Sequence, residues 1–203
     1  SKLDVTTFSW QKVLGGEAQH GIIVLSPRAV ERLESYKPSW PIPKLFRLTS
    51  KGKFQSKIFN GSTINTPSML CIEDAIHSLK WVDSIGGANT MIKRSLSNLQ
   101  VIEKWESKTN WIEFLAKNKD TRSSTSICLK IIDPWFLQLS TDSKKEILQS
   151  FFSLLEEKEA AYDINHYPSA PPGIRIWGGG TVETSNIELL LPWLDWAWEY
   201  IEK

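Results

Sequence analysis

One short apolar run constrains the fold of this chain more than any other feature. Residues 21–25, GIIVL, carry no polar side chain and are followed directly by Ser26-Pro27. A continuous apolar run of this length is too short for a buried helix and is typical of a strand covered on both faces, as in α/β sheets. Ser26 suits a helix N-cap and Pro27 the first helical position, which predicts a helix over residues 27–35. This strand and helix together indicate an α/β fold.

Two longer helices are expected in the middle of the chain. Apolar residues at helical spacing predict one over residues 68–85 and another over 88–107. The Gly86-Gly87 pair between them predicts a left-handed helix end, and such a junction often marks the passage from one domain to the next. The expected inward positions are Ile72, Ala75, Ile76, Leu79 and Val82 in the first helix, and Ile92, Leu96, Leu99 and Ile102 in the second.

A different alternation of strands and helices follows residue 110. Ser185 with Glu188 three residues later has the form of a capping box, which predicts the start of the last helix. The tryptophans at 193, 196 and 198 are expected to pack that helix on its domain. We therefore expect a first domain over residues 1–95 and a compact α+β domain over 96–203. The other elements expected in the second domain are strands at 113–116, 125–132 and 174–177 and a helix over 142–159.

Composition and charge exclude several classes of partner. The chain has 24 Lys and Arg against 23 Asp and Glu, a formal net charge of +1, so we expect neither a nucleic-acid nor a membrane-surface protein. No apolar stretch approaches the length of a membrane helix, and no leader pattern is present at residue 1. Cys71 and Cys128 lie in apolar runs without a CxxC pattern, which indicates reduced thiols and a cytoplasmic location.

Lys12 is the first candidate for chemistry. It lies between an apolar aromatic stretch and Gly15-Gly16, just before the GIIVL strand. Partly desolvated surroundings favour the free amine, which is the form that attacks a carbonyl. The two glycines would let the backbone pass close to a flat cofactor. The alternative is an ordinary surface lysine at the end of a strand.

Asn65-Thr66-Pro67 is the second candidate. Proline at the first helical position would make Thr66 the N-cap of the helix over 68–85. A helix N-terminus offers unpaired amides and a partial positive charge, which suit a phosphate, and the side chains of Asn65 and Thr66 would add hydrogen bonds. The alternative is that Thr66 only caps its own helix.

Arg175 is the third candidate. It alternates with Ile174 and Ile176 in a short strand, so its side chain should lie on the face opposite the two isoleucines. Either that face is open to solvent, or the guanidinium is partly buried and needs an anionic partner. The glycines at 178–180, read as leaving room for a ligand, favour the second interpretation.

The histidines carry less information. His20, His77 and His166 are far apart and lack the spacing of metal ligands, so no metal site is expected. His166 lies in a polar loop nine residues before Arg175 and is a weaker candidate for binding the same anion. Signatures of serine hydrolases, zinc proteases, P-loop proteins and Rossmann folds are absent from the sequence.

Four stretches together resemble the phosphoserine aminotransferases of α-proteobacteria and some archaea. They are DVTTFSWQKVLGGEAQHG, STINTPSMLCIEDAIHSLKWVDSIGG, TRSSTSICLKI and APPGIRIWGGGTVE. The resemblance runs in register over nearly all of the chain. It implies the C-terminal part of a fold-type I, pyridoxal-phosphate-dependent transferase, with the end of the large α/β domain over 1–95 and the small domain over 96–203.

The resemblance also implies a reaction and roles for residues. Such enzymes move the amino group of glutamate to 3-phosphohydroxypyruvate and make O-phosphoserine, with pyridoxal 5'-phosphate (PLP) bound to a lysine that here is Lys12, beside Gln11. Asn65 and Thr66 would reach the phosphate of the cofactor in a partner subunit, so a homodimer with shared sites is implied. Arg175 would grip the substrate α-carboxylate.

Several family features are absent from these residues. They are the aspartate that pairs with the pyridine nitrogen, the aromatic residue stacked on the ring, the segment that cradles the cofactor phosphate within its own subunit, and most groups that read the substrate phosphate. The sequence therefore leaves open a non-catalytic folding or dimerisation fragment. It also leaves open a related transaminase of the same fold that acts on another small amino acid.

Overall fold

The chain forms two compact units. A computed structural model describes residues 2–18 and 20–202. One unit covers residues 1–81 and the other residues 82–203, so the division falls within the helix α2 (Met69–Ser84). The sequence placed a domain boundary after residue 95, inside the next helix, α3 (Gly87–Glu106). α3 packs with the later elements, and it therefore belongs to the second unit.

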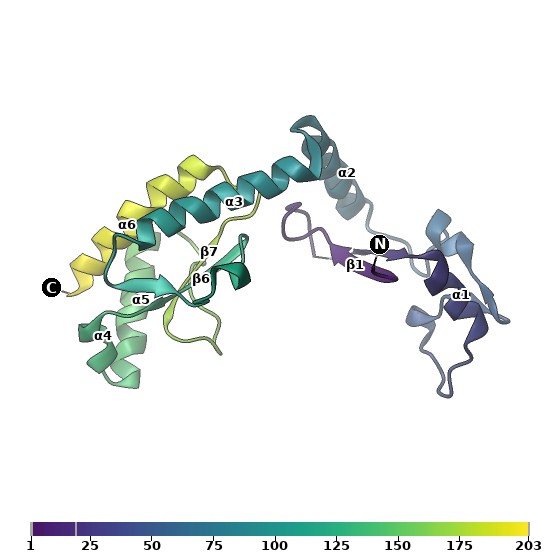
Figure 1. The fold of residues 1–203 in the computed structure, drawn as a ribbon, viewed down its shortest axis with the longest axis horizontal. Coiled ribbons are helices and arrows are strands. Elements are labelled where there is room, and N and C mark those ends of the chain that lie inside the picture. The colour runs from purple at the N-terminus through teal and green to yellow at the C-terminus, as the bar shows by residue number, and fades with distance from the viewer. Residues whose placement is uncertain (1, 19, 203) are drawn as a thin grey trace. The chain divides into compact units, whose positions relative to one another are not determined.

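A two-stranded antiparallel ribbon and a short helix organise the first unit (Figure 1). Strand β1 (Val5–Ser9) pairs with β2 (Gly21–Leu25), and helix α1 (Pro27–Ser35) follows at once. The Ser26 hydroxyl accepts a hydrogen bond from the amide of Ala29 and so caps α1, as the sequence predicted. The same hydroxyl donates to Asp4. Hydrogen bonds from Arg28 and Ser26 hold the pKa of the Asp4 carboxyl below its usual value.

The prediction that GIIVL is covered on both faces is wrong for this chain. β2 is a strand, but Ile22, Ile23 and Val24 are 38 to 54% exposed. The physical reason is that β2 pairs with β1 alone and lies in a sheet of only two strands. A run of apolar residues gives the local conformation of a strand, whereas burial depends on how many neighbours the strand has.

Short elements fill the rest of the first unit before α2. Strands β3 (Thr49–Ser50) and β4 (Lys53–Phe54), each two residues long, form a hairpin. The 3-10 helices η1 (Lys44–Phe46) and η2 (Ser56–Asn60) flank it in the sequence. The hairpin turns through Lys51 and Gly52, both at positive φ. No strand longer than two residues forms among the described residues of this stretch.

Helices α2 and α3 meet at Gly86-Gly87, as predicted, and both glycines have positive φ. The inward faces differ from those expected. In α2, Cys71, Ala75 and Val82 are buried while Ile76 and Leu79 are exposed. In α3, the buried residues are Met91, Ser95, Asn98, Leu99 and Ile102, and Ile92 and Leu96 are exposed. Two polar side chains thus lie on the buried stripe of α3, which an apolar pattern cannot indicate.

The second unit is a three-stranded antiparallel sheet with helices on one face. The strands are β5 (Ile112–Phe114), β6 (Ser126–Ile131) and β7 (Gly173–Trp177), in the order β5-β6-β7. Their alternate residues are buried against α3, α5 (Thr141–Glu157) and α6 (Thr184–Glu202). Figure 1 shows α3 and α6 running side by side, in agreement with their contacts. α6 begins at Thr184, so Ser185 lies inside it and the predicted capping box is wrong.

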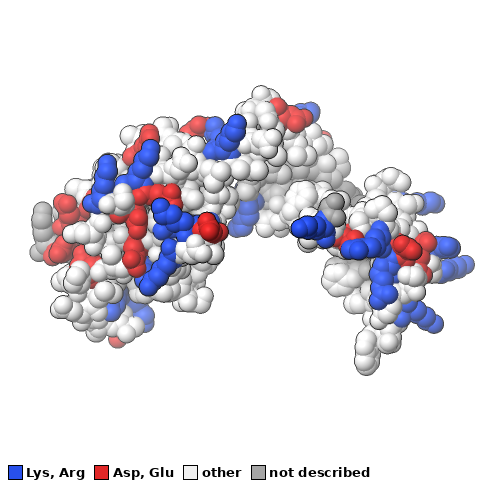
Figure 2. Space-filling view, in the orientation of Figure 1, with Lys and Arg blue, Asp and Glu red and all other residues white. Residues whose placement is uncertain are grey.

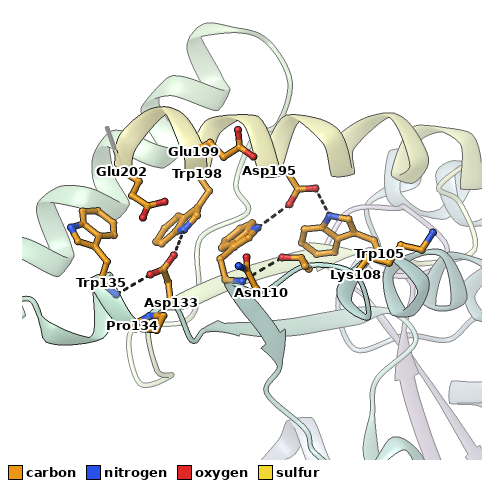
Figure 3. Close-up of a pocket in the computed structure, with 12 residues that line it drawn as sticks. Trp105, Lys108, Asn110, Asp133, Pro134, Trp135, Asp195, Trp198, Glu199 and Glu202 are labelled. Atoms are coloured by element: carbon orange, nitrogen blue, oxygen red, sulfur yellow. Dashed lines mark hydrogen bonds between the residues drawn. The ribbon is translucent and has the colours of Figure 1, made fainter.

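Hydrogen bonds between tryptophans and two aspartates connect α6 to α3, to the residue before β5 and to the start of the short helix α4 (Pro134–Gln138) (Figure 3). The Asp195 carboxylate accepts hydrogen bonds from the indoles of Trp105 and Trp111, both at 2.8 Å. Asp133, the N-cap of α4, accepts from Trp198 at 3.0 Å. Trp111 and Trp198 stack at 4.8 Å. Trp198 therefore packs as expected, whereas Trp193 and Trp196 are 41 and 37% exposed and do not.

The visible surface mixes both signs of charge. Figure 2 shows Lys and Arg interspersed with Asp and Glu on the face that it presents. This distribution agrees with the near-zero net charge of the sequence. Among the described helices, none combines the length and apolar character needed to cross a bilayer.

The tryptophan-aspartate contacts predict a large loss of stability on truncation. Asp195→Ala leaves two indole N–H groups without an acceptor, and we expect it to lower the free energy of unfolding by about 2–4 kcal/mol. Asp195→Asn keeps one amide oxygen and should lose roughly half as much. Urea unfolding followed by tryptophan fluorescence measures both. Glu199→Ala, on the exposed side of α6, is the control and should change stability by less than about 0.5 kcal/mol. An Asp195→Ala protein as stable as wild type would contradict the assignment.

Candidate functional site

Lys12 lies in a tight turn that directly follows β1. The Gly15 amide donates to the Lys12 carbonyl at 3.0 Å, and the Gly16 amide donates to the Trp10 carbonyl at 3.1 Å. Gly15 has φ +71, and a Cβ on Gly16 would lie 2.6 Å from the Trp10 ring. Both glycines are thus required by the turn itself. The Lys12 side chain is exposed and has no hydrogen bond or ion pair to the described residues. The partly desolvated setting expected from the sequence is not provided by these residues.

This turn packs against the start of α2. The ring of Trp10 is 7% exposed and joins Leu14, Cys71 and Ala75 in a small apolar cluster. The thiol of Cys71 donates to the Glu17 carboxylate at 3.5 Å. Residues about 55 positions apart in sequence therefore hold the lysine turn and the helix together.

His20 connects the same two segments through a second contact. Its Nε2 accepts a hydrogen bond from the backbone amide of Ser68 at 3.0 Å. Its ring also meets the ring of Trp10 edge-on, with the centroids 6.0 Å apart. His20 therefore touches the residue two positions before Lys12 and the residue two positions after Thr66.

The segment Asn65-Thr66-Pro67 lies at the N-terminal end of α2, but Thr66 is not its cap. α2 begins at Met69, and the Ser68 hydroxyl accepts from the Cys71 amide at 3.4 Å, so Ser68 caps the helix. Pro67 precedes the cap instead of opening the helix. Asn65 and Thr66 are exposed. Thr66 consequently keeps its hydroxyl available, and the alternative that it only caps its own helix is removed.

Arg175 lies on the face of β7 that the helices do not cover. Ile174 and Ile176 are buried on the opposite face, as the alternation predicted. The Arg175 side chain is 19% exposed, and its Nη2 donates to the carbonyl and the carboxylate of Asp163, both at 3.3 Å. The guanidinium carbon lies 4.8 Å from the centre of the Tyr167 ring. Its Nε is buried and has no hydrogen-bond partner among the described residues. This donor is therefore unsatisfied within the described structure.

His166 lies in the loop that runs along the outer edge of β7. Asn165 forms a β-bridge with Ile174, and the Ile164 carbonyl accepts from the Arg175 amide at 2.8 Å. The Nδ1 of His166 is buried and, like the Nε of Arg175, unpaired within the described structure. Two buried nitrogens without partners thus belong to one sheet edge. Buried polar nitrogens without partners are uncommon in folded proteins, so both of these atoms need an explanation.

The glycines at 178–180 do not leave room for a ligand, and the interpretation made from the sequence is wrong. All three are buried. A Cβ on Gly178 would lie 2.9 Å from Ile127, one on Gly179 would lie 2.6 Å from the Trp177 ring, and one on Gly180 would lie 2.9 Å from the Met91 carbonyl. The protein's own side chains and backbone occupy the space that the missing Cβ atoms open.

Asn98 holds this glycine loop in place through buried hydrogen bonds. It is fully buried, its amide nitrogen donates to the carbonyls of Gly178 and Val182 at 3.1 Å, and its oxygen accepts from Thr184 at 2.7 Å. It therefore anchors the connection between β7, which carries Arg175, and α6.

Sequence reasoning missed four residues that hold the Lys12 turn or the surroundings of Arg175 in place. They are His20, Asn98, Asp163 and Tyr167. Tyr167 adjoins His166 and could have been suggested by that position, since an aromatic ring beside a guanidinium is a common pairing. Asn98 and His20 act across 80 and 48 positions of the chain, and no local pattern signals such contacts.

No group of three or more histidine, cysteine, aspartate or glutamate side chains that could hold a metal ion occurs within the described structure. The pocket in Figure 3, about 690 Å³ in volume, is lined by none of the residues that the sequence suggested for cofactor or substrate binding. Two of its carboxylates, Asp133 and Asp195, already accept tryptophan hydrogen bonds. We assign this pocket to packing.

Comparison with curated proteins finds sequences that are similar over nearly all of this chain. It is 52% identical over 201 residues to a protein named phosphoserine aminotransferase from Methanosarcina mazei, a match that covers 99% of this chain. The chain is homologous to the phosphoserine aminotransferases. It spans about half the length of that relative, since the match covers 52% of it. No family model matches the chain.

Several solved structures with the same fold are phosphoserine aminotransferases. Phosphoserine aminotransferase from Bacillus circulans matches 97% of this chain and 48% of its own length, with a TM-score of 0.72 at 17% identity. PLP-bound phosphoserine aminotransferase from Trichomonas vaginalis matches 96% of the chain and 48% of its own length, with a TM-score of 0.68 at 16% identity. These likenesses confirm the predicted fold class, α/β and part of a fold-type I PLP-dependent transferase.

The anchoring role of Asn98 predicts a loss of stability that a neighbour does not share. Asn98→Ala removes the partner of the buried Gly178 and Gly179 carbonyls and of the partly buried Val182 carbonyl and Thr184 hydroxyl. We expect it to lower the free energy of unfolding by about 2–4 kcal/mol. Ser95→Ala is the control, since Ser95 lies one turn away on the same buried stripe. Its hydroxyl donates to the Ile92 carbonyl of its own helix at 3.1 Å and makes one longer contact, at 3.4 Å, with the Ser124 hydroxyl. Ser95→Ala should cost less than about 1 kcal/mol. Chemical denaturation measures both, and equal losses would argue against the anchor.

Proposed function

We propose that this chain carries the cofactor lysine and the substrate-carboxylate arginine of an aminotransferase. The reaction moves the amino group of glutamate to 3-phosphohydroxypyruvate and gives O-phosphoserine, a step of serine biosynthesis. Homology to phosphoserine aminotransferases at 52% identity is the observation that carries the proposal. The free cysteines Cys71 and Cys128 agree with a reducing, cytoplasmic setting.

The residues of the lysine turn fit PLP. The amine of Lys12 is exposed and unpaired among the described side chains, so it is free to condense with an aldehyde. Beside it, the Nε1 of Trp10 and the Oε1 of Gln11 are buried without partners in the described residues. Buried polar atoms of this kind are usually satisfied when a site is complete. We assign Gln11 and Lys12 to cofactor binding.

Asn65 and Thr66 would hold the cofactor phosphate. Both are exposed beside the N-terminal end of α2, where backbone amides and the helix dipole favour an anion. In this proposal they serve the cofactor of a partner subunit, so that the protein acts as a homodimer with shared sites.

Arg175 would bind the α-carboxylate of each substrate. One edge of its guanidinium is held by Asp163, and its Nε remains free inside the site. A guanidinium grips a carboxylate through two parallel hydrogen bonds, which fixes the orientation of the acid. His166, whose Nδ1 is likewise free, would add a hydrogen bond to the same anion or to the substrate phosphate.

The chain's own groups divide the chemistry between them. PLP supplies, when bound, the electron sink that makes the Cα proton of an amino acid acidic. The Nζ of Lys12 would act as the base that removes that proton and as the acid that returns it. Arg175 holds both substrates by the same carboxylate, which a reaction of two substrates at one site requires.

A second candidate is a non-catalytic folding or dimerisation module. The exposure of Lys12 favours it, because these residues alone do not desolvate the amine. Adding PLP to the 203-residue chain and recording its visible absorbance separates the candidates. A stable shifted band that borohydride fixes on Lys12 counts against the module.

A third candidate is a transaminase of the same fold for another small amino acid. It differs only in substrate. Rates with 3-phosphohydroxypyruvate compared with pyruvate or glyoxylate as amino acceptor discriminate it from the first.

Lys12→Ala should abolish transamination in the full-length protein. We expect at least a thousandfold loss of kcat, on the order seen when an essential nucleophile or base is removed. Stability should change by less than about 0.5 kcal/mol, because the side chain is exposed. Steady-state kinetics and thermal unfolding measure these effects. Lys37→Ala, at another exposed lysine, is the matched control. A fully active Lys12→Ala enzyme would end the proposal.

Arg175→Lys should weaken the binding of both substrates. An ammonium is a point charge and cannot make the paired contact, so we expect KM for glutamate and for the oxo acid to rise by about tenfold or more. Arg32→Lys, in the exposed helix α1, is the control and should leave both values unchanged. Unaltered KM values in Arg175→Lys would show that another group binds the carboxylate.

A further inference from the structure

His20 accepts one hydrogen bond that joins two cofactor-binding segments of the proposed function. One segment carries Lys12, which binds the cofactor of its own subunit, and the other carries Asn65 and Thr66, which reach the cofactor of the partner subunit. Its Nε2 accepts from the Ser68 amide at 3.0 Å, and its ring meets Trp10 edge-on. His20 itself does not adjoin either candidate group in sequence: Lys12 lies eight positions earlier and Thr66 lies on a distant segment.

The link from Ser68 to Thr66 is stiff. Pro67 has a ring that fixes its own φ. The residue before a proline is restricted to extended conformations, and this residue is Thr66. Fixing the amide of Ser68 therefore also restricts where Thr66 can lie. The Asn65 carbonyl accepts from the Thr63 hydroxyl at 2.7 Å, which adds a local restraint on the other side.

The link from Trp10 to Lys12 is stiff as well. The two glycine amides close the turn onto the carbonyls of Trp10 and Lys12, at 3.1 and 3.0 Å. Trp10 is 7% exposed and lies in the apolar cluster with Cys71. His20 thus bridges two short, restrained segments, one that ends at the amine and one that ends at the phosphate-binding side chains.

We propose that His20 is a positioning residue, which holds Asn65 and Thr66 at a fixed place relative to the Lys12 turn by accepting the hydrogen bond of the Ser68 amide. This inference rests on the proposed function. In it, the imidazole touches neither cofactor nor substrate and acts only through Ser68. Loss of the imidazole should weaken the binding of the partner subunit's cofactor phosphate by Asn65 and Thr66. The Lys12 amine should still be able to react with an aldehyde.

Two substitutions separate the hydrogen bond from the packing of the ring. His20→Phe keeps an aromatic ring against Trp10 but has no acceptor. His20→Gln places an amide oxygen near the position of Nε2 and keeps the acceptor. His20→Leu repeats the loss of the acceptor if His20→Phe does not fold, as judged by circular dichroism.

The first measurement tests the bond without any cofactor. Amide hydrogen exchange at Ser68 in the cofactor-free, full-length protein should be about tenfold faster in His20→Phe than in wild type, because the donor loses its partner. In His20→Gln it should stay within about threefold of wild type. Equal protection in wild type and His20→Phe would overturn the inference.

The second measurement compares PLP with pyridoxal, which has the aldehyde but no phosphate. We expect His20→Phe to raise the Kd for PLP about tenfold, as is common for residues that orient ligand-binding groups, and to change the Kd for pyridoxal by less than about twofold. His20→Gln should restore PLP binding to within about threefold of wild type. Equal losses for both ligands, or no rescue by a folded His20→Gln protein, would overturn it.

A double-mutant cycle tests whether His20 acts through the phosphate-binding side chains. In a background of Asn65→Ala with Thr66→Ala, His20→Phe should cost less than about threefold in Kd for PLP, since the groups it positions are already gone. A full tenfold cost in that background would show that His20 acts elsewhere.

Failure of this inference is distinguishable from failure of the proposed function. If the wild-type protein binds no PLP, or borohydride fixes it on a residue other than Lys12, the proposed function is wrong and the inference falls with it. If wild type binds PLP at Lys12 and His20→Phe binds it equally tightly, only the role of His20 is overturned.

Discussion

One-sided burial of a three-stranded sheet governs the second unit. The strands β5, β6 and β7 place isoleucines, one leucine and one phenylalanine at alternate positions against the helices, and this period of two leaves the intervening residues on the opposite face. Arg175 is one of these intervening residues, next to Cys128 on the neighbouring strand. Its partial burial therefore comes from the loop along the edge of the sheet, through Asp163 and Tyr167, and not from the core. A rigid strand positions the guanidinium while an exposed loop determines what surrounds it.

The first unit is built on a different principle. It has no comparable core, and its ribbon of two strands leaves Ile22, Ile23 and Val24 well exposed. The contacts that span the greatest sequence distance there join the lysine turn to the start of α2, through Trp10, Glu17 and His20. Those contacts are few and specific. They lie where the proposed function needs fixed geometry, which is why the loss of one acceptor is expected to be measurable.

Local patterns in the sequence predicted much of the fold. Ser26-Pro27, the double glycine at 86 and 87, and the alternation around Arg175 each identified an element correctly, because caps, positive φ and period-two burial are determined by nearby residues. Burial was predicted less well. The exposure of GIIVL depends on the number of neighbouring strands, and the buried stripe of α3 includes Ser95 and Asn98, whose partners lie about 30 and 80 positions away.

Local chemistry in the sequence identified Lys12, Asn65-Thr66 and Arg175 as candidates, and the resemblance to a family then supplied their specific roles. Thr66 was assigned as a helix cap and is not one, since the helix starts three residues later with Ser68 as its cap. Lys12 was expected to be partly desolvated and is exposed. In both cases the local reasoning identified the segment, and the exact role depended on contacts that no short pattern contains.

The packing of the glycine loop after β7 has a consequence for redesign. Residues 178–180 are enclosed by Met91, Ile127 and Trp177, and a single added carbon on any of them meets an atom at less than 3.0 Å. Substitutions at these three glycines would therefore disturb the packing of the loop, and the loop is a poor place to introduce sequence variation in a redesign. Asp163 and Tyr167, which contact the Arg175 guanidinium, lie in an outer segment with side chains at least half exposed, so this segment has room for other side chains. If Arg175 binds the substrate as proposed, substitutions that alter substrate choice should be tolerated in this segment and not in the glycine loop.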